Sequence, residues 1–261
     1  MPFSNLSALK DFLDQQLIRY NAPDFIEEDP IVLPHAYTNP LDIEIAAFFA
    51  AILAWGKRKT IILKGKQLFS MMDDAPYDFI MNHRPKDLDP FLNFKHRTFN
   101  ATDTLYFIQF LRQHYQQHNT LETTFITDLS AQAPTVEAGL VHFHQLFFSL
   151  PNAPIRTRKH VATPARNAAC KRLNMFLRWM VRSDNQGVDF GIWKRIKPHQ
   201  LICPCDVHVS QVSRKLGLMQ RPYTDWQAAL ELTQNLRLFC PEDPVKYDFA
   251  LFGLGRYGTI Q

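Results

Sequence analysis

The segment LICPCDVHVSQVSRKLGL, residues 201–218, places two cysteines, an aspartate and a histidine within six positions. Thiolates and an imidazole are ligands that zinc accepts, so Cys203, Cys205 and His208 form one candidate metal site. A closed zinc site needs four ligands, and no Cys-x-x-Cys pair elsewhere in the chain could complete this one. We therefore expect no metal, which leaves Asp206 as the residue of this segment that could do chemistry.

Asp206 stands where a helix is expected to begin. Val209, Val212 and Leu216 follow it at the spacing of one helix face, and Gly217 is suited to end the helix in a left-handed conformation. An aspartate at such an N-cap accepts hydrogen bonds from open backbone N–H groups and commonly contributes about 1 kcal/mol. Capping is therefore a sufficient explanation of Asp206 taken alone.

The residues around Asp206 also resemble a known signature. The pattern P-C-D-V-H-V-S-Q-V-S-R-K-L-G-L is similar to the P-V-D-x-H-V-x-R-V-x-x-R-L-G signature of the helix-hairpin-helix DNA glycosylase superfamily, whose aspartate begins a helix and faces the flipped nucleotide. The resemblance implies a catalytic role for Asp206 and DNA contacts for His208 and Arg214. The matching residues are Pro204, Asp206, His208, Val209, Val212, Leu216 and Gly217, and Arg214 falls near the family's basic residue.

The second half of that superfamily's site is a lysine on an earlier helix. The segment ACKRLNMFLRWMVR resembles the family's GxKTANxxL helix, with Lys171 at the lysine position and Asn174 at the asparagine position. Asp206 follows Lys171 by 35 residues, a spacing similar to that of the archaeal 8-oxoguanine DNA glycosylases. The chain is thus identified as a member of an uncharacterised bacterial family distantly related to this superfamily. The resemblance is strong from about residue 168 to 258 and weak over the first 150 residues.

The resemblance implies an enzyme of base-excision repair. A bifunctional glycosylase uses an amine to attack the sugar C1′ and form a Schiff base, and a carboxylate to stabilise the developing cation and move protons. Lys171 and Asp206 would fill these roles on double-stranded DNA that contains a damaged base, for example an oxidised purine, and AP-lyase activity would accompany excision. The alternative is a non-catalytic nucleic-acid-binding protein that retains the glycosylase fold.

The hairpin that names the superfamily, L-P-G-x-G, is missing, because the residues before Lys171, VATPARNAAC, include no glycine. In the superfamily this hairpin offers backbone N–H groups to a DNA phosphate, so basic side chains would have to take its place. The block from Arg156 to Arg182 contains eight basic residues and no acid. It is interpreted either as a solvated helix face or as a phosphate-binding surface. The second interpretation assigns DNA contacts to Arg156, Arg158, Lys159, Arg166 and Arg172.

The turn Trp55-Gly56-Lys57-Arg58 lies between two expected helices of the N-terminal half. It resembles the place where glycosylases present the residues that plug the gap left by a flipped base, which implies DNA contacts for Trp55, Lys57 and Arg58. Trp55 would stack on the orphaned base. A position in the core is the alternative for this tryptophan.

The C-terminal segment DPVKYDFALFGLGRYG is apolar with charges around it. In glycosylases of this topology the C-terminal helix helps to line the base pocket, so Phe249 and Phe252 are assigned to that pocket together with Asn174, with core packing as the alternative. Lys246 and Asp248 are candidates for an ion pair. The four cysteines lack the clustered C-terminal spacing of the iron–sulfur glycosylases, and we expect no cofactor.

The elements that must position these residues are predicted to be helices. Every longer segment shows a 3.6-residue period, and IEIAAFFAAILAW is apolar nearly all round, as in a buried central helix. We find no convincing strand, and nine glycines are too few for a hairpin-rich β architecture. We predict an all-α, two-lobed bundle like that of the helix-hairpin-helix DNA glycosylases, with the active cleft between the lobes.

The chain is expected to form a single two-lobed helical domain over residues 1–261. The proline-rich segment LPNAPIRTRKHVATP interrupts the helices, so the lobe boundary is predicted near residues 150–165, with the N-terminal segment returning to the C-terminal lobe.

Composition supports a packed protein, with 46% hydrophobic and 21% charged residues and a net charge of +4. The first 20 residues contain no basic leader followed by an apolar core, and no apolar run reaches the roughly 18 residues of a membrane span. We therefore expect a cytoplasmic monomer with reduced thiols and no membrane contact.

Overall fold

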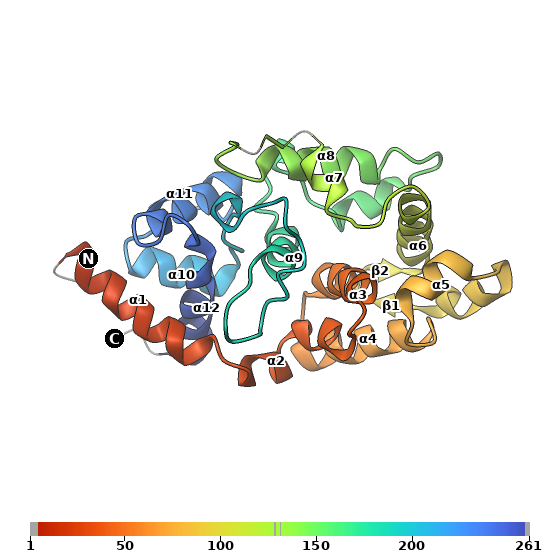
Figure 1. Cartoon of the computed structure of the whole chain (residues 1–261), viewed down its shortest axis with the longest axis horizontal. Coiled ribbons are helices and arrows are strands. Elements are labelled where there is room, and N and C mark those ends of the chain that lie inside the picture. The colour runs from red at the N-terminus through yellow and green to blue at the C-terminus, as the bar shows by residue number, and fades with distance from the viewer. Residues whose placement is uncertain (1–4, 128, 131, 259–261) are drawn as a thin grey trace. The chain divides into compact units, whose positions relative to one another are not determined.

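The computed structural model describes residues 5–127, 129–130 and 132–258 (Figure 1). These residues divide into two compact units. The first comprises the described residues of Met1–Phe25, Ser130–Ala138 and Thr163–Gln261, and the second comprises those of Ile26–Leu129 and Gly139–Ala162. Both consist mostly of helices, which confirms the predicted all-α class.

The first unit is built from five main helices and three short 3-10 helices. They are α1 (Leu6–Tyr20), η5 (Pro164–Arg166), α9 (Lys171–Val181), η6 (Pro198–Gln200), α10 (Val207–Lys215), α11 (Trp226–Arg237), η7 (Pro244–Tyr247) and α12 (Asp248–Tyr257).

Helix α12 packs against both α1 and α10, as Figure 1 shows. Two glycines of α12 allow this close approach. A Cβ atom added at Gly253 would lie 2.2 Å from the ring of Tyr20 on α1, and one at Gly255 would lie 2.8 Å from Cβ of His208 on α10. The C-terminal helix is thereby held against the helix that begins after Asp206.

The second unit contains the remaining elements, with α2 and α8 running across the unit boundaries. They are α2 (Asp24–Glu28), η1 (Pro30–Val32), η2 (Pro34–Ala36), α3 (Pro40–Leu53), α4 (Arg58–Ser70), α5 (Pro76–Asn82), η3 (Pro85–Asn93), β1 (Lys95–His96), β2 (Phe99–Asn100), α6 (Ala101–Tyr115), α7 (Thr123–Ile126), α8 (Glu137–Phe147) and η4 (Ile155–Lys159).

Helix α3 is the core of the second unit. Every residue from Ile43 to Leu53 is buried, as predicted from its apolar run. Phe48 and Phe49 pack against aromatic rings of α4, α6 and α8. Glu44 is the charged residue among these buried positions, and its carboxylate accepts hydrogen bonds from Tyr115, from the Thr120 hydroxyl at 2.6 Å and from the Leu121 N–H at 2.7 Å. Its burial is therefore compensated by three donors.

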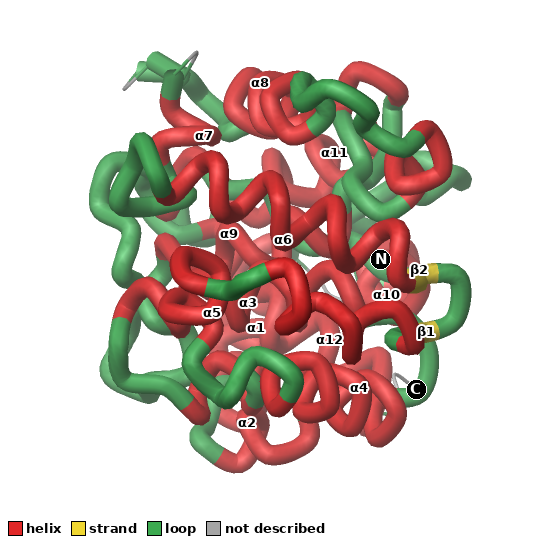
Figure 2. Tube along the Cα trace, turned by 90° about the vertical axis from the view of Figure 1, so that its right-hand side faces the viewer, coloured by secondary structure: helices red, strands yellow, loops and turns green. Residues whose placement is uncertain are grey.

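The prediction that the chain has no strand is wrong at one place. Strands β1 and β2 form an antiparallel hairpin that pairs Lys95 with Asn100 and His96 with Phe99. In Figure 2 the two strands are the short yellow segments, joined by a green loop. Two residues per strand are too few to produce the alternation by which a strand is recognised in a sequence.

None of the helices in the described part of the chain combines the length and the apolar character that crossing a membrane would require.

Candidate active site

Lys171 and Asp206 lie together in the first unit. The Nζ atom of Lys171 is 3.7 Å from Oδ2 of Asp206, and the two side chains are 30% and 19% exposed. Asp206 is the N-cap of α10, as predicted, and its Oδ1 accepts the Val209 N–H at 2.9 Å. One carboxylate oxygen thus caps the helix while the other faces the lysine. Lys171 and Asp206, which the two motifs place 35 residues apart in the sequence, therefore lie close together in the structure.

Lys171 is the first residue of α9, which begins later than its sequence pattern suggests. Asn167 and Cys170 both adopt left-handed backbone conformations, with φ of 53° and 49°, and Cys170 is the N-cap. A non-glycine residue pays roughly 1–2 kcal/mol for this conformation. The turn before the helix therefore places non-glycine residues in left-handed conformations that glycine would adopt at no steric cost.

This turn is anchored to the start of α11. The Asn167 side chain donates to Oδ2 of Asp225 at 3.0 Å, and the Asn167 carbonyl accepts the Trp226 N–H at 3.2 Å. Asp225 is the N-cap of α11 and also pairs with Arg221 at 2.6 Å. These contacts help to compensate the strained backbone and determine where α9, and with it Lys171, begins.

Two arginines of the predicted basic block lie in the interior. Arg178, two helical turns after Lys171, donates to Asp189 at 3.2 Å and to Asp248, and it is 3% exposed. Arg182, also 3% exposed, pairs with Asp184, Asp189 and Asp243 at 2.8 to 3.0 Å. The interpretation of the block as a solvated face is wrong for these two residues, because acids from distant segments surround them.

Asp248, the first residue of α12, links this ion-pair network to the candidate site. Burial raises the pKa of Asp248 to about 6 and the negative charge of Asp206 adds to that effect, while the cations Arg178 and Lys171 oppose it. The carboxylate is therefore electrostatically coupled to both residues of the candidate pair. The expected Lys246–Asp248 pair is wrong, since Lys246 Nζ lies 4.0 Å from Asp14 instead.

The two cysteines before Asp206 are buried and do not converge with His208. Cys205 Sγ lies 3.2 Å from the Ser210 hydroxyl, and Cys203 Sγ lies 3.9 Å from Oδ1 of Asp248. Burial raises the pKa of Cys205 to about 11, which keeps it a thiol. His208 is exposed on α10. Among the described residues, no three His, Cys, Asp or Glu side chains are grouped so that they could hold a metal ion.

The three residues assigned to a base pocket have different surroundings. Asn174 is 1% exposed, and its side-chain amide donates to the Ala169 carbonyl at 3.1 Å, while its Oδ1 has no hydrogen-bond partner among the described residues. The Phe249 ring is fully buried, with the Arg178 guanidinium 4.2 Å from its centre. Phe252 is half-buried. Phe249 thus packs in the core, the alternative considered for it, and the unpaired oxygen of Asn174 is buried as well.

The four residues of the first unit that were assigned to DNA contacts differ in accessibility. Arg166 and His208 are exposed. Arg172 is partly buried, and burial lowers its pKa to about 10. Arg214 donates to the Arg221 carbonyl at 2.9 Å, so part of its guanidinium is used within the unit.

In the second unit, the turn at residues 55–58 lies beside the β1–β2 hairpin. His96 Nε2 lies 3.2 Å from the Trp55 carbonyl, and the Arg97 guanidinium lies over the Trp55 ring, 4.8 Å from its centre. Trp55 is half-buried and Lys57 is exposed. Arg58 is paired with Asp29 at 3.4 Å.

The remaining residues assigned to DNA contacts belong to η4, also in the second unit. Arg156 donates to Asp103, to Asn100 at 2.5 Å and to the Thr98 carbonyl at 2.8 Å. Arg158 lies 4.7 Å from the centre of the Phe148 ring, and Lys159 is exposed. Arg156 therefore ties η4 to the hairpin and to the start of α6.

Asp248, Arg178 and Arg97 were not assigned to the site from the sequence. Arg178 was seen only as one of eight basic residues, and Asp248 only as a possible partner of Lys246. Arg97 stands in the segment KHRTFN, whose contact with Trp55 depends on residues 42 positions apart. No local pattern signals such a contact.

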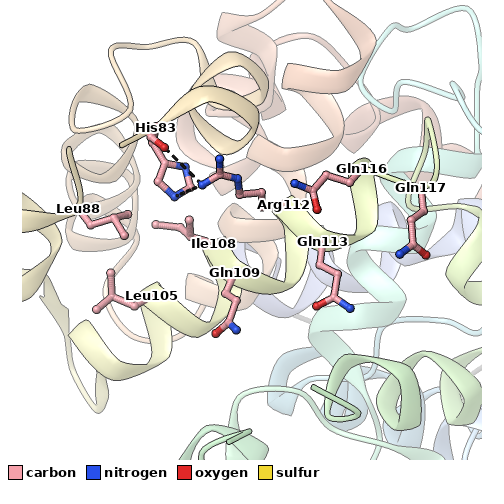
Figure 3. A pocket seen from close by; sticks show the side chains of 9 residues that line it. All are labelled: His83, Leu88, Leu105, Ile108, Gln109, Arg112, Gln113, Gln116 and Gln117. Carbon is pink, nitrogen blue, oxygen red and sulfur yellow. Dashed lines mark hydrogen bonds between the residues drawn. The ribbon is translucent and has the colours of Figure 1, made fainter. Parts of the chain in front are cut away.

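A cavity of about 610 Å³ opens along α6 in the second unit (Figure 3). None of its lining residues was singled out from the sequence. Arg112 is the cation in this lining, and its guanidinium is hydrogen-bonded to the His83 ring at 3.3 Å. The lining residues are His83, Leu88, Leu105, Ile108, Gln109, Arg112, Gln113, Gln116 and Gln117.

A family model described as "Protein of unknown function (DUF2400)" matches residues 29–257, nearly the whole chain. Neither the curated proteins nor the solved structures gave a match. The resemblance to the DNA glycosylases therefore stands on the motif residues of the sequence alone. The chain belongs to the family described as "Protein of unknown function (DUF2400)".

Proposed function

We propose that this protein is a DNA glycosylase with AP-lyase activity that removes a damaged base from double-stranded DNA. The observation that carries the proposal is the approach of Lys171 Nζ to within 3.7 Å of Asp206 Oδ2, with both side chains still partly open to solvent. An amine beside a carboxylate supplies the nucleophile and the proton acceptor that Schiff-base chemistry at a sugar carbon uses.

In the proposed reaction, the neutral Lys171 amine forms a bond to C1′ of the damaged nucleotide. The bond between C1′ and the base nitrogen breaks, and the base leaves with the electron pair and takes up a proton. Loss of a proton from the lysine nitrogen and opening of the sugar ring give an imine. Loss of a proton from C2′ then expels the 3′ phosphate, which is the lyase step. The base must leave the helical stack first, because its glycosidic bond is otherwise out of reach.

Asp206 has two tasks in this scheme. Its Oδ2 faces the lysine, where a negative charge stabilises the cation that develops at C1′ and can accept the proton that the amine must lose. Its Oδ1 remains hydrogen-bonded to the Val209 N–H, which keeps the carboxylate oriented. The capping role and the catalytic role therefore use different oxygen atoms of one side chain.

The experiment is borohydride trapping, which reduces the imine to a stable amine. Labelled duplexes containing 8-oxoguanine, an oxidised pyrimidine, uracil or an abasic site are incubated with protein and sodium borohydride. We expect a covalent adduct with the wild-type protein, none with Lys171→Ala, and wild-type amounts with Lys215→Ala, which removes an exposed lysine from the end of α10. The lyase proposal fails if every duplex leaves the wild-type protein unmodified, or if Lys171→Ala traps as well as the wild type.

A second function, binding of nucleic acid without catalysis, is favoured by one observation in the other unit. The exposed residues Lys57 and Arg97 lie beside the half-buried Trp55, a combination of cations and an aromatic ring suited to nucleic acid. A protein of this kind would bind DNA with strong salt dependence and would give no adduct with any lesion.

A further inference from the structure

Arg97 occupies a strained position at the tip of the β1–β2 hairpin. Its φ is 55°, in the left-handed region that favours glycine or asparagine over arginine. A long charged side chain is thus present where a smaller residue would form the turn more easily. Strain of this kind is commonly found at functional positions and is a reason to examine what the side chain does.

The Arg97 side chain lies over the ring of Trp55 on the neighbouring turn. Its guanidinium is 4.8 Å from the centre of the Trp55 ring. Gly56 makes room for it, since a Cβ atom there would lie 2.8 Å from Nη1 of Arg97, and the φ of Gly56 is +110°. The hairpin is held to the same turn by His96, whose Nε2 lies 3.2 Å from the Trp55 carbonyl.

The stacked guanidinium keeps its donors available. In the described part of the chain no hydrogen bond or ion pair engages Arg97, and the residue is exposed. Stacking on an aromatic ring occupies the face of the guanidinium and leaves the N–H groups at its edge, whose fork geometry matches two oxygens of a phosphate. Arg58 and Arg156 differ from it, because they are paired with Asp29 and Asp103.

Further positive charge surrounds Arg97. Lys57 and Lys95 are exposed, one on the same turn as Trp55 and the other on β1. Lys57 is also the N-cap of α4, and because an ammonium group cannot accept a hydrogen bond, the first N–H groups of this helix lack a capping side chain. Burial lowers the pKa of His96, and the nearby cations Arg97 and Lys64 lower it further.

We propose that Arg97, stacked on Trp55 and flanked by Lys57 and Lys95, binds a backbone phosphate of double-stranded DNA. We call these four residues the hairpin surface. The inference rests on the proposed function for its choice of DNA as the partner, and it adds Arg97 and Lys95 to the residues that hold the substrate. No acidic side chain is paired with these cations in the described part of the chain, so the surface is complementary in charge to a polyanion.

The test is fluorescence anisotropy with the full-length protein and a labelled, undamaged 20-base-pair duplex at several potassium chloride concentrations. We expect Arg97→Gly to weaken binding about five- to tenfold and to reduce the slope of log affinity against log salt by about one, as for loss of one phosphate contact. Glycine suits the left-handed φ, so thermal unfolding of this variant should occur at the wild-type temperature or above it.

Arg97→Lys keeps the charge but loses the fork and the stacking, and we expect an intermediate affinity with the wild-type salt slope. Lys86→Gln is the matched control, because it removes an exposed cation of the same unit that lies outside the hairpin surface. Its affinity and slope should equal those of the wild type. The inference is overturned if Arg97→Gly binds as Lys86→Gln does, or if an RNA duplex or single-stranded DNA of the same sequence binds more tightly than the DNA duplex.

These outcomes separate the inference from the proposed function. Binding to an undamaged duplex requires no base excision. Weak binding by Arg97→Gly in a protein that never forms a borohydride adduct therefore supports the hairpin surface and contradicts the proposed Lys171 lyase. If instead the wild-type protein forms adducts with lesion-containing DNA and Arg97→Gly binds the undamaged duplex as tightly as the wild type, the proposed function is supported and the hairpin surface is contradicted.

Discussion

Lys171 Nζ lies 3.7 Å from Oδ2 of Asp206, although 35 residues separate the two positions in the chain. One residue begins α9 and the other caps α10, so the relative position of two helix starts determines the distance between amine and carboxylate. Side chains on regular elements are held more exactly than side chains on loops, which suits a pair that must keep its geometry through a reaction.

The two roles of Asp206 can be separated by substitution. Asparagine is as good an N-cap as aspartate, so Asp206→Asn should change the free energy of unfolding by less than about 0.5 kcal/mol, whereas Asp206→Ala should cost about 1 kcal/mol. Asparagine lacks the negative charge, and we expect the single-turnover rate of borohydride trapping to fall about 100-fold or more in both variants. Urea unfolding and trapping kinetics measure the two effects. Equal trapping rates for Asp206→Asn and wild type would show that the carboxylate serves only as a cap.

Arg178 should be among the most important residues for stability. It is 3% exposed and pairs with Asp189 and Asp248, so Arg178→Met leaves buried carboxylates without this cation. Removing one partner of a buried ion pair costs about 3–5 kcal/mol. Arg166→Met, an exposed arginine of the same basic block, should cost less than about 0.5 kcal/mol. Urea unfolding of the two variants checks this difference, and similar costs would contradict a stabilising ion-pair network around Arg178.

Asp248 should make stability depend on pH in a defined direction. Burial raises its pKa from 3.8 to about 6 in the folded protein, with Asp206 adding to the shift and Arg178 and Lys171 opposing it. The folded state therefore binds more protons than the unfolded state between these values. The stabilisation linked to this proton is complete below pH 3.8 and is lost as the pH rises through about 6, an effect of roughly 3 kcal/mol.

The measurement is the free energy of unfolding from pH 4 to pH 7 for the wild type and for Asp248→Asn. The free energy of unfolding of the wild type minus that of Asp248→Asn should decrease as the pH rises, because the asparagine does not titrate. A difference that stays constant, or that increases with pH, would mean that the pKa of Asp248 is not raised in the folded protein.

Local features of the fold could be predicted from the sequence because they depend on neighbouring residues. Asp206 caps the helix that was expected to begin beside it, and the apolar run at residues 43–53 is buried. Caps and helix periods arise from hydrogen bonds and side-chain spacing within a few residues. The start of α9 was less predictable, because Asn167 and Cys170 take left-handed conformations that are compensated by bonds to α11, a contact across 58 positions.

The sequence by itself determined the helical class, the helix that Asp206 begins, and the choice of Lys171 and Asp206 as candidate catalytic residues. Only the tertiary structure decided that these two side chains meet, that Arg178 and Arg182 lie in a buried ion-pair network, and that Arg97 stacks on Trp55. The physical reason is that a charge is placed by the segments that pack around it. A basic residue looks the same in a sequence whether a distant aspartate neutralises it or its donors remain open to a phosphate.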